Sequence, residues 1–560
     1  MRYEHRGGRR GRPRLATLSW KRIGALGTSA TAACIVAGFA AAGGTGISTP
    51  SGDGSGSLQT LAKIASADRH HPFFDAAIGT NGQSCATCHQ PNQAFSLGVG
   101  SIDQSFAATE GRGVLFRPND TADRPDADVS TEAARTKAYK LFLDLGVVRI
   151  GKTFKGNSDP DNVATTQSDF RVEVQDTPEF GTLPNRADPQ HPGIPSLSLF
   201  RRPIVNTGVN FDSAVLWDGR DGIGALAESQ VPKAIQSLLL GKGTDPRINQ
   251  AIADFMTGVV TDQVYDNAAQ SLAAHDAGGG ARNLLAMADD LARPCAYRTA
   301  FPQIPGMPSP GAPVLTPFSP PTCTRIDAGK PHTFGMDLFD AWARLPGDGG
   351  GIDAARAAIA RGQKLFNTVA LHQPADLDGK LLDVASAANG GVNLDRADRI
   401  PAGTPIHCVT CHAAHNLGNN PNPNFIGRIG TDSLGILEGL VAKSAAQDPL
   451  LLPILANARK LPLYCLRPNK DTTPFSEATC GTRPDDVKTT DPGRAMVTGL
   501  IADVGKFKPP VLRDLAGRAP YFHAGTAATI FDLIDFYDAR FEINLTKEQK
   551  SDLAKFLLAL

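Results

Sequence analysis

The sequence predicts a mostly α-helical fold in two lobes, with long irregular loops and few strands. Three observations lead to this prediction. A chain of 560 residues is too long for one small core, so two to four domains are expected. Two short cysteine motifs lie more than 300 residues apart, and a helical pattern precedes each. The ranges 157–200 and 293–333 are dense in Pro, Gly, Asp and Thr, which favours loops.

The composition is that of an ordinary globular protein, with 41% hydrophobic and 20% charged residues. It excludes disordered, collagen-like and polytopic membrane classes. Lysine plus arginine equals aspartate plus glutamate at 56 each, but the first 22 residues hold eight basic side chains and one acidic side chain. The remainder has 48 basic against 55 acidic residues, a charge of −7. An acidic body argues against nucleic acid as a partner and favours a basic one.

The N-terminus has the pattern of an export signal. An arginine-rich stretch precedes an uncharged apolar run over 23–42, and small residues at 40–42 offer a cleavage site. The alternative is an uncleaved membrane anchor, which would be the only membrane contact. We therefore expect residues 1–45 to be a signal peptide or anchor and 46–68 to be a linker, with the body outside the cytoplasm.

Two pentapeptides have the form C-x-x-C-H, the attachment signal of c-type haem. Two thiols form thioethers to the vinyl groups of one porphyrin, and the next histidine then binds the iron. Zinc or dithiol redox sites are the alternatives. A four-cysteine zinc site would need the two pairs to meet and would leave both histidines unexplained, so we predict two covalently bound haems. The residues are Cys85, Cys88 and His89 in the first motif and Cys408, Cys411 and His412 in the second.

The other cysteines lack metal-ligand spacing. Cys34 lies in the apolar leader, and we expect it to be removed with the signal. Disulfides are the expected role of the remaining four in an oxidising compartment. Of three possible pairings, the local one joins Cys295 to Cys323 and Cys465 to Cys480.

Helical patterns place the two cytochrome c-like haem lobes. Apolar residues recur every seven residues over 352–366, ahead of the second motif, and Leu58, Leu61 and Ala65 share one helical face ahead of the first. Residues 546–549 form a capping box that opens a C-terminal helix. With the break between lobes near 346–351, we expect a first haem domain over 69–345 and a second over 346–560.

Further segments resemble the bacterial di-haem cytochrome c peroxidase and MauG family, over about a quarter of the chain. Residues 216–220 read LWDGR and 226–230 read LAESQ, similar to a stretch that walls the distal side of that family's first haem. Residues 506–515 (KFKPPVLRDL) and 519–525 (APYFHAG) are similar to a block of its second haem domain. Residues 93–95 and 361–366 also fit the resemblance.

The resemblance implies a division of labour between the haems. The first, held by His89, would be peroxidatic, with an open face where hydrogen peroxide binds. The second, held by His412, would be six-coordinate and would relay electrons from a donor protein such as a small cytochrome c or a cupredoxin. The resemblance also implies a periplasmic location.

Axial ligation decides which haem can react. Peroxidases of the family carry a removable distal histidine soon after the first motif, but here none occurs between His89 and His191. The first haem is therefore expected to be five-coordinate or water-bound, unless the fold delivers His191 or His275. For the second haem the resemblance places the distal ligand at Tyr537, where MauG has tyrosine. A phenolate would stabilise ferric iron.

Alternatives stay open for the second haem. Tyr537 could be a packed helix aromatic, and His523 and Met496 are the other candidate ligands. His523 could also hydrogen-bond a haem propionate.

Glu228 is the candidate acid/base for O–O cleavage, because a carboxylate in a haem pocket can move a proton between peroxide oxygens. The alternative is a solvated helix glutamate. Val215 stands where the family has a distal glutamine, which weakens the peroxidase prediction. Trp217 is the best aromatic candidate in the first pocket wall, although it could be structural, and Trp342 is the candidate for an aromatic step between the haems.

Arg220 and Arg513 are candidate partners of haem propionates, because guanidinium groups match carboxylates; surface ion pairs are the alternative. The resemblance also implies one calcium ion between the lobes, for which Asn206 or Asn210 could be a ligand.

The leading hypothesis is an exported di-haem oxidoreductase that reduces hydrogen peroxide at the first haem with electrons relayed through the second. One alternative is a di-haem oxygenase that cleaves a hydrophobic substrate with dioxygen. Val215 and the long insertions favour it. Another is a non-catalytic electron carrier with both irons saturated.

Overall fold

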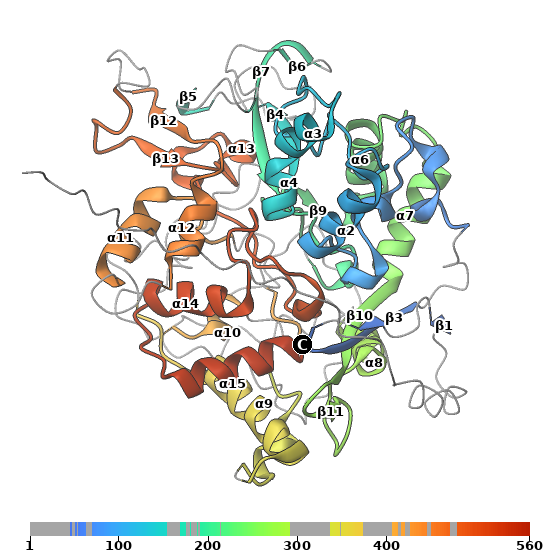
Figure 1. The fold of residues 1–560 in the computed structure, drawn as a ribbon, viewed down its shortest axis with the longest axis vertical. Coiled ribbons are helices and arrows are strands. Elements are labelled where there is room, and N and C mark those ends of the chain that lie inside the picture. The colour runs from blue at the N-terminus through green and yellow to red at the C-terminus, as the bar shows by residue number, and fades with distance from the viewer. Residues whose placement is uncertain are drawn as a thin grey trace, which may run out of the picture. The chain divides into compact units, whose positions relative to one another are not determined.

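The computed structural model describes most of the chain after the leader. The described residues are 45–46, 51–52, 54–62, 70–153, 168–174, 180, 187–188, 191–212, 214–291, 336–347, 349–372, 406–412, 416–419, 426–444, 450–470 and 479–560 (Figure 1). All the elements named below belong to one unit, Gly44–Leu560. The proposed signal or anchor up to residue 44, Cys34 and the pair Cys295 and Cys323 lie outside the described residues. Among the described residues, no helix has both the length and the apolarity needed to cross a membrane.

Short helices surround the first cysteine motif. Local sequence sets their ends: Thr131 caps α3 by accepting from the Ala134 N–H at 3.1 Å, and Gly146 ends α4 with a φ of 63°, which glycine adopts without strain. Asp245 caps α7, which starts with Pro246. The helices are α1 Cys85–Cys88, α2 Val99–Thr109, α3 Glu132–Ala138, α4 Lys140–Leu145, α6 Val231–Ser237 and α7 Pro246–Gly258.

The helix expected over 58–65 is wrong, because this segment begins as a strand. β3 (Gly56–Ala62) pairs antiparallel with β10 (Val259–Asp266), with Ala62 opposite Val259. Leu58, Thr60 and Ala62 are fully buried at alternate positions, and the Thr60 hydroxyl lies 2.8 Å from that of Thr261. Buried residues alternate along this segment, as in a strand, and β10 is available to pair with it. The segment therefore forms a strand despite the helical spacing of its apolar residues. The strand lies within the range expected to be a linker.

Three short strands complete this sheet, whose order is β1-β3-β10-β11 with β2 paired to β3. They are β1 Thr45–Gly46, β2 Ser51–Gly52 and β11 Gln270–Ser271. Gly517 lies against the sheet, since a Cβ there would come within 2.8 Å of a Leu58 methyl group.

The range 157–200, expected to be loop, also contains strands, so that expectation is wrong for 170–174, 187–188 and 191–200. β5 (Phe170–Val174) joins β12 (Tyr464–Pro468) and β13 (Val487–Thr489) in one sheet. A second sheet has the order β4-β7-β6, and β8 pairs with β9. Their bounds are β4 Val148–Thr153, β6 Ala187–Asp188, β7 His191–Arg201, β8 Ala214–Val215 and β9 Asp221–Gly222.

The predicted disulfide between Cys465 and Cys480 is confirmed. It ties β12 to the segment that leads into β13. Arg467 of the same strand forms a buried ion pair with Asp486 at 2.7 Å.

Helices dominate the C-terminal half. The expected helix over 352–366 is confirmed as α9, although its first apolar residue, Ile352, is 44% exposed. The capping box at Thr546 is confirmed at the start of α15. The helices are α8 Ala281–Leu291, α9 Gly351–Thr368, α10 Cys408–Cys411, α11 Leu434–Ser444, α12 Leu452–Ala458, α13 Ala495–Thr498, α14 Ile530–Arg540 and α15 Lys547–Leu558.

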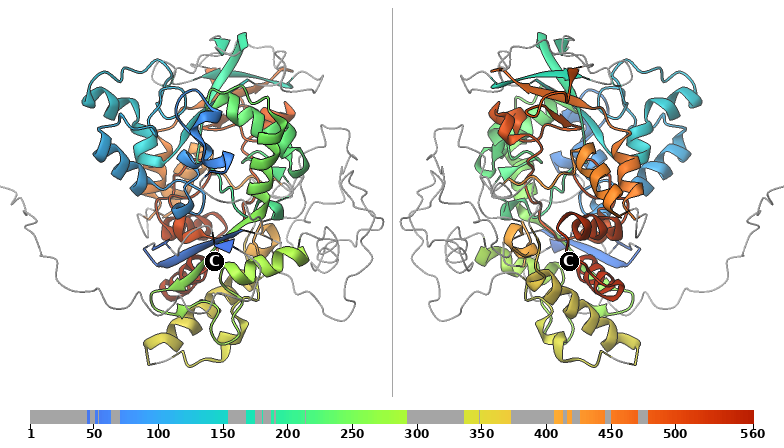
Figure 2. Two further views of the ribbon diagram at one scale, coloured as in Figure 1. Left: turned by 90° about the vertical axis from the view of Figure 1, so that its right-hand side faces the viewer. Right: turned by 90° about the vertical axis from the view of Figure 1, so that its left-hand side faces the viewer.

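α9 and α15 lie side by side, as the yellow and red helices show in both figures (Figures 1 and 2). The two helices approach closely at Gly362, where a Cβ would come within 2.0 Å of the Asp552 carbonyl oxygen and 2.7 Å of the Phe556 Cβ. A glycine is therefore required at this crossing.

The largest hydrophobic cluster crosses the expected boundary near 346–351. It joins Leu272 and Trp342 to Phe366 of α9 and Phe556 of α15. A second cluster packs Phe73, Phe95, Phe255 and other apolar residues around the first motif. The division into two cytochrome c-like haem lobes stays a prediction.

Candidate functional site

The first C-x-x-C-H motif forms a single helical turn that orients its histidine. The Ser84 N–H donates to the Thr87 hydroxyl at 2.9 Å, and the His89 N–H donates to the Cys85 carbonyl at 3.0 Å. The His89 Nδ1 lies 2.9 Å from the Phe95 carbonyl oxygen. Because a carbonyl only accepts, Nδ1 carries the proton and Nε2 keeps its lone pair. This tautomer is the one that metal-binding imidazoles use.

The second motif repeats this geometry. The His407 N–H donates to the Thr410 hydroxyl at 2.9 Å, and the His412 N–H donates to the Cys408 carbonyl at 3.0 Å. The His412 Nδ1 is hydrogen-bonded to the Gly418 carbonyl oxygen. In both motifs the accepting carbonyl lies six residues after the histidine. Two segments distant in the sequence thus present Nε2 in the same way.

Burial keeps both imidazoles neutral near neutral pH. It lowers the pKa of His89 to about 4, against the opposing effect of hydrogen bonds with the Phe95 and Ile204 backbone. It likewise lowers the pKa of His412 to about 4, opposed by the bond to Gly418. A neutral imidazole is the form that binds a metal.

Burial also keeps the four motif thiols protonated, which is the reverse of a reactive dithiol. None of the four forms a disulfide. The pKa is raised to about 12 for Cys85, Cys408 and Cys411, and it is raised for Cys88. Within the described ranges, no group of three or more His, Cys, Asp or Glu side chains could hold a metal ion. The two cysteine pairs therefore do not meet in a zinc site.

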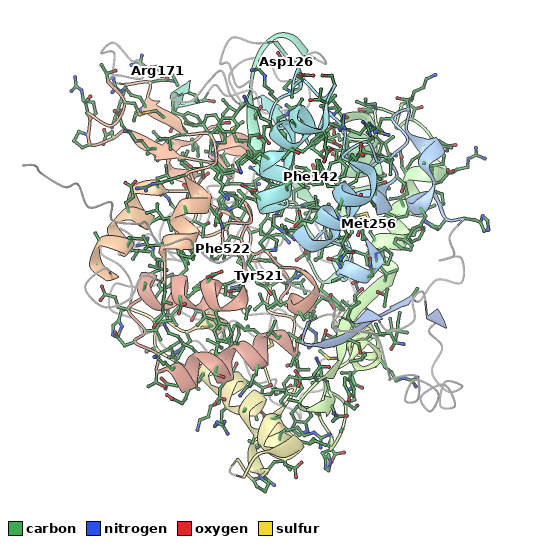
Figure 3. The ribbon with its side chains drawn as sticks, in the orientation of Figure 1. Asp126, Phe142, Arg171, Met256, Tyr521 and Phe522 are labelled. Atoms are coloured by element: carbon green, nitrogen blue, oxygen red, sulfur yellow. A yellow bond between two sulfur atoms is a disulfide. The ribbon has the colours of Figure 1, made fainter. Side chains whose placement is uncertain are left out.

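A largely apolar cavity surrounds the second motif. Cys408, Cys411 and His412 form part of its wall, and Tyr521 and Phe522, labelled in Figure 3, form another part. The described lining residues include no aspartate or glutamate. Paired cysteines and a neutral imidazole at the wall of an apolar cavity fit a c-type haem. The other lining residues are Ser96, Arg202, Pro203, Ile204, Val205, Trp217, Phe366, Val369, Leu371, Ile406, His407, Gly427, Ile429, Thr431, Phe507, Lys508, Pro509, Pro510, Leu512, Leu515, Arg518, Pro520, His523, Leu533, Ile534, Tyr537, Phe541, Ile543, Leu545, Leu553 and Leu557.

The structure brings two of the three candidate distal ligands to this cavity. Tyr537 of α14 lines it, and burial together with Cys411 and Cys408 raises the pKa of its phenol. His523 also lines the cavity. Met496 is buried in a different cluster, with Leu466 and other residues, and does not line it.

His523 is held by aromatic stacking rather than by strong hydrogen bonds. Its ring lies 3.9 Å from that of Phe507, centroid to centroid, and its Nδ1 lies 3.5 Å from the Thr431 hydroxyl. Its Nε2 is buried without a hydrogen-bond partner among the described residues. Burial lowers the pKa of His523 to about 4, so the ring is neutral.

Trp217 lines the cavity at the second motif, and its expected role in the wall of the first haem pocket stays a prediction. Its indole N–H donates to the Arg202 carbonyl at 2.9 Å, and its ring meets His523 edge-on at 6.5 Å. The neighbouring Asp218 is fully buried between Arg201 and Arg220, at 2.7 and 2.5 Å. The W-D-G-R segment therefore positions an aromatic ring through a buried ion network.

The candidate propionate partners Arg220 and Arg513 are both paired with protein carboxylates. Arg220 binds Asp218, and Arg513, 1% exposed, lies 3.0 Å from Asp262. Neither lines the described cavity. Two other arginines, Arg202 and Arg518, do line it, and the sequence reasoning missed both. The only signal for them was their position directly before Pro203 and the A-P-Y block.

The first motif packs against apolar residues. Cys85 and Ala86 contact the cluster that contains Phe73, Phe255 and Val215. The Phe73 and Phe255 rings stack at 4.5 Å. The distal-side position held by Val215 is thus part of an apolar wall beside this motif.

Glu228 belongs to the π-helix η7 (Leu226–Gln230), a rare element that often marks functional sites. Leu226 and Ala227 pack on the cluster beside Cys85, whereas the Glu228 side chain is exposed. The segment shares a hydrophobic cluster with Cys85, and the Glu228 carboxylate is exposed rather than buried beside the motif.

The remaining sequence-predicted residues are two candidate haem ligands, two candidate calcium ligands and Trp342. His275 is exposed, and the side chain of His191 lies outside the described residues. Asn210 has a buried Oδ1 without a partner among the described residues, and the Asn206 N–H donates to the Phe95 carbonyl at 3.3 Å. A calcium ion there stays a prediction. Trp342 is fully buried in the core, with its indole N–H bound to the Ala274 carbonyl, and does not line the cavity.

Comparison with known proteins supports a partial likeness. No family model matches the chain. A stretch of 81 residues is 36% identical to the cytochrome-c peroxidase IdrP1 of Pseudomonas sp. (strain SCT), covering 12% of this chain and 21% of that protein. The likeness to cytochrome-c peroxidase IdrP1 of Denitromonas iodatirespirans is 35% over 81 residues, covering 12% and 22%. The matched part spans about a fifth of the length of these curated relatives.

Proposed function

We propose that the chain is an exported di-haem c-type oxidoreductase that reduces hydrogen peroxide at the haem of the first motif. Electrons reach it through the haem of the second motif from a periplasmic donor, a small cytochrome c or a cupredoxin. The observation that carries the proposal is the repeated geometry of His89 and His412. In each, Nδ1 is hydrogen-bonded to the backbone carbonyl of the residue six positions later in the sequence. The relatives' name, cytochrome-c peroxidase, supports the reaction class.

Each motif supplies the groups that hold and tune its haem. When bound, a haem iron with an open axial position supplies O–O bond activation, and each peroxide takes up two electrons and two protons to give two waters. Cys85 and Cys88 tether the first haem. The carbonyl of Phe95 fixes the plane of the His89 ring and raises the basicity of Nε2.

We assign proton movement at the first site to Glu228. Its carboxylate is exposed, so it exchanges protons with solvent, and the apolar side chains of Leu226 and Ala227 anchor its segment beside Cys85. With the haem in place, this carboxylate would move a proton between the two oxygens of hydrogen peroxide. Val215 cannot take part in this proton transfer, because its side chain has no polar atom.

At the second site we assign the distal position to Tyr537. It shares the cavity with His412, and its phenol hydroxyl is the polar group that α14 brings to an apolar wall. A buried phenol with a raised pKa stays protonated on its own and loses its proton only to a metal ion. His523 is the second candidate, because its buried Nε2 has no partner among the described residues.

We assign the electron path between the haems to Trp217 rather than to Trp342. Trp217 lines the second cavity and is bonded to the carbonyl of Arg202, the residue before Pro203. The Ile204 backbone interacts with His89. One short segment therefore connects the Trp217 indole to the proximal histidine of the first motif.

The central test counts haems in the full chain and assigns their spin states. We expect a pyridine haemochrome to give two c-type haems per chain, and the double variants C85A/C88A and C408A/C411A to keep one each. Ferric electron paramagnetic resonance should show one high-spin and one low-spin iron, and only the low-spin signal should vanish in C408A/C411A. Peroxide should oxidise a reduced cytochrome c or cupredoxin catalytically.

The outcomes separate the alternatives. One haem, or bound zinc, contradicts the proposal. Two low-spin irons without peroxide turnover identify an electron carrier. Replacing Glu228 with Gln should slow peroxide cleavage by about a hundredfold while both haems remain. An unchanged rate removes Glu228 from the mechanism.

A second function is favoured by the apolar wall of the first site. Val215, Phe73 and Phe255 belong to the cluster that contacts Cys85 and Ala86. Such a wall suits a di-haem oxygenase that cleaves a hydrophobic substrate with dioxygen. Oxygen uptake on polyisoprene-like substrates, without peroxide turnover, would establish this function in place of the first.

A further inference from the structure

The cavity at the second motif contains an unbalanced set of buried positive charges. Arg202, Lys508 and Arg518 line it, and the described lining residues include no carboxylate. Arg202 is 4% exposed and Arg518 is 8% exposed. Burying unpaired cations costs several kcal/mol each, by order of magnitude. The fold therefore lacks an anion at this place.

Lys508 is already neutralised, but the two arginines are not. The Lys508 ammonium lies 2.6 Å from the Asp212 carboxylate. The Arg202 Nη2 donates to the Arg518 carbonyl at 2.9 Å and to the Ser96 hydroxyl at 3.3 Å, and its Nη1 is buried without a partner among the described residues. The Arg518 Nη2 donates to the Val511 carbonyl at 2.8 Å. No described carboxylate lies within ion-pair distance of either guanidinium.

The groups around the two arginines do not remove the imbalance. Burial and then the charge of Arg518 lower the pKa of Arg202 to about 9. Burial lowers the pKa of Arg518, and Asp514, Tyr521 and Asp212 oppose this change only in part. His523 is neutral, and its nearest acidic influences, Asp491 and Asp432, are buried in other contacts.

We propose that Arg202 and Arg518 form the subsite that binds the propionate carboxylates of the haem attached at Cys408 and Cys411. The inference rests on the proposed function, because it requires that haem. A free anion such as phosphate would satisfy the charges, but the rest of the cavity wall is apolar. An apolar macrocycle that carries carboxylates matches both parts of the wall, and guanidinium groups bind carboxylates well.

The subsite also explains why Arg202 lies beside both motifs. Ser96, which its Nη2 contacts, follows Phe95, whose carbonyl holds His89. Its own carbonyl holds the Trp217 indole. A propionate bound here lies at the junction of the second haem, the tryptophan and the first motif's proximal segment.

The test uses the full holoprotein carrying haem labelled with ¹³C at the propionate carboxyls, in R202Q and R518Q. Arg356→Gln is the matched control, because Arg356 is also buried but does not line the cavity. We expect two haems in every variant. Infrared redox difference spectra should show shifted labelled carboxylate bands in R202Q and R518Q and wild-type bands in R356Q.

The reduction equilibrium of the low-spin haem gives a second measure. Removing a nearby positive charge stabilises the ferric state, so at pH 8 the equilibrium should move towards it by roughly tenfold in R202Q and R518Q. With the cation gone, the propionate takes up a proton when the iron is reduced. The equilibrium should then vary with pH between 5 and 8 by up to about tenfold per unit, where the wild type is flat.

Unshifted labelled bands and a wild-type equilibrium in folded R202Q and R518Q would overturn the subsite, and they would point to a free anion instead. If both glutamine variants fail to fold, R202K and R518K retain the charge and should keep the flat pH profile. The C85A/C88A variant, which keeps only the haem of the second motif, is also decisive: a labelled protonated carboxyl band above pH 6 contradicts the inference. Absence of haem would instead reject the proposed function itself.

Discussion

The Trp217 indole donates its N–H to the Arg202 carbonyl oxygen at 2.9 Å. This single bond joins the W-D-G-R segment to the residue that precedes Pro203, beside the Ile204 backbone that interacts with His89. The indole ring also meets His523 in the cavity of the second motif. The segments around Trp217 and His523, which are far apart in the sequence, thus meet at this cavity.

Replacing Trp217 with Phe should slow electron transfer between the haems by roughly tenfold, because a phenyl ring is harder to oxidise than an indole and cannot donate the bond to Arg202. Stopped-flow absorbance after peroxide addition measures the rate at which the low-spin haem is oxidised. The control is W342F. Trp342 is a core residue, so this change should lower the free energy of unfolding by about 1–2 kcal/mol and leave the rate unchanged. If electron transfer is slow in W342F and has the wild-type rate in W217F, the electron path runs through Trp342 instead of Trp217.

Replacing Tyr537 with Phe should change the low-spin signal of the second haem and raise its reduction potential, because an anionic phenolate stabilises the ferric state. The comparison is H523Q, which removes the other candidate ligand, whose Nε2 is buried without a partner among the described residues. Electron paramagnetic resonance of both ferric variants decides between them. If H523Q alters the signal and Y537F leaves it intact, His523 is the ligand.

The contribution of Asp120 to the stability of the protein should fall as the pH rises from about 4 to about 7. Burial raises the pKa of Asp120 to about 7, with Arg149 and Arg117 opposing the shift, whereas an unfolded aspartate titrates near 3.9. Across this window the folded state holds a proton that the unfolded state has lost, so stability decreases with pH. D120N should remove this slope and be more stable at pH 7 by about 2–4 kcal/mol. Denaturant unfolding at several pH values measures both, and an equal slope in D120N would contradict the assignment.

Replacing Gly362 with Ala should destabilise the fold by about 3 kcal/mol, because the new Cβ would lie 2.0 Å from the Asp552 carbonyl oxygen of α15. The matched control is G439A in α11. That glycine is exposed, nothing lies within 4 Å of its Cβ position, and alanine there should stabilise the helix by about 0.5–1 kcal/mol. Chemical denaturation of the two variants compares them directly. Equal stabilities would show that α9 and α15 are not packed closely.

The features of this protein that could be predicted from the sequence depend on residues that lie close together in the chain. The two C-x-x-C-H motifs each form one helical turn, because four consecutive residues suffice to build it. The capping box at Thr546 and the disulfide between Cys465 and Cys480 also depend on residues close in the chain. Each of these features is decided within fifteen residues.

Features that need a distant partner could not be predicted in this way. Leu58 and Leu61 have helical spacing, yet they form a strand because β10 supplies the other half of the sheet some 200 residues later. Arg513 reads as a free cation until the fold places Asp262 3.0 Å away. Arg202 and Arg518 look like ordinary arginines until the fold buries them together without a carboxylate.

The sequence by itself therefore determined where the two C-x-x-C-H sets lie, and it predicts that their thiols and imidazoles hold two haems. Only the tertiary structure decided the surroundings of the second set, with Trp217, His523 and Tyr537 brought to one cavity. The physical reason is the distance along the chain over which each kind of interaction acts. Helical turns and thioether spacing are satisfied by neighbours along the chain, whereas burial and charge pairing depend on whatever the rest of the chain packs against a side chain.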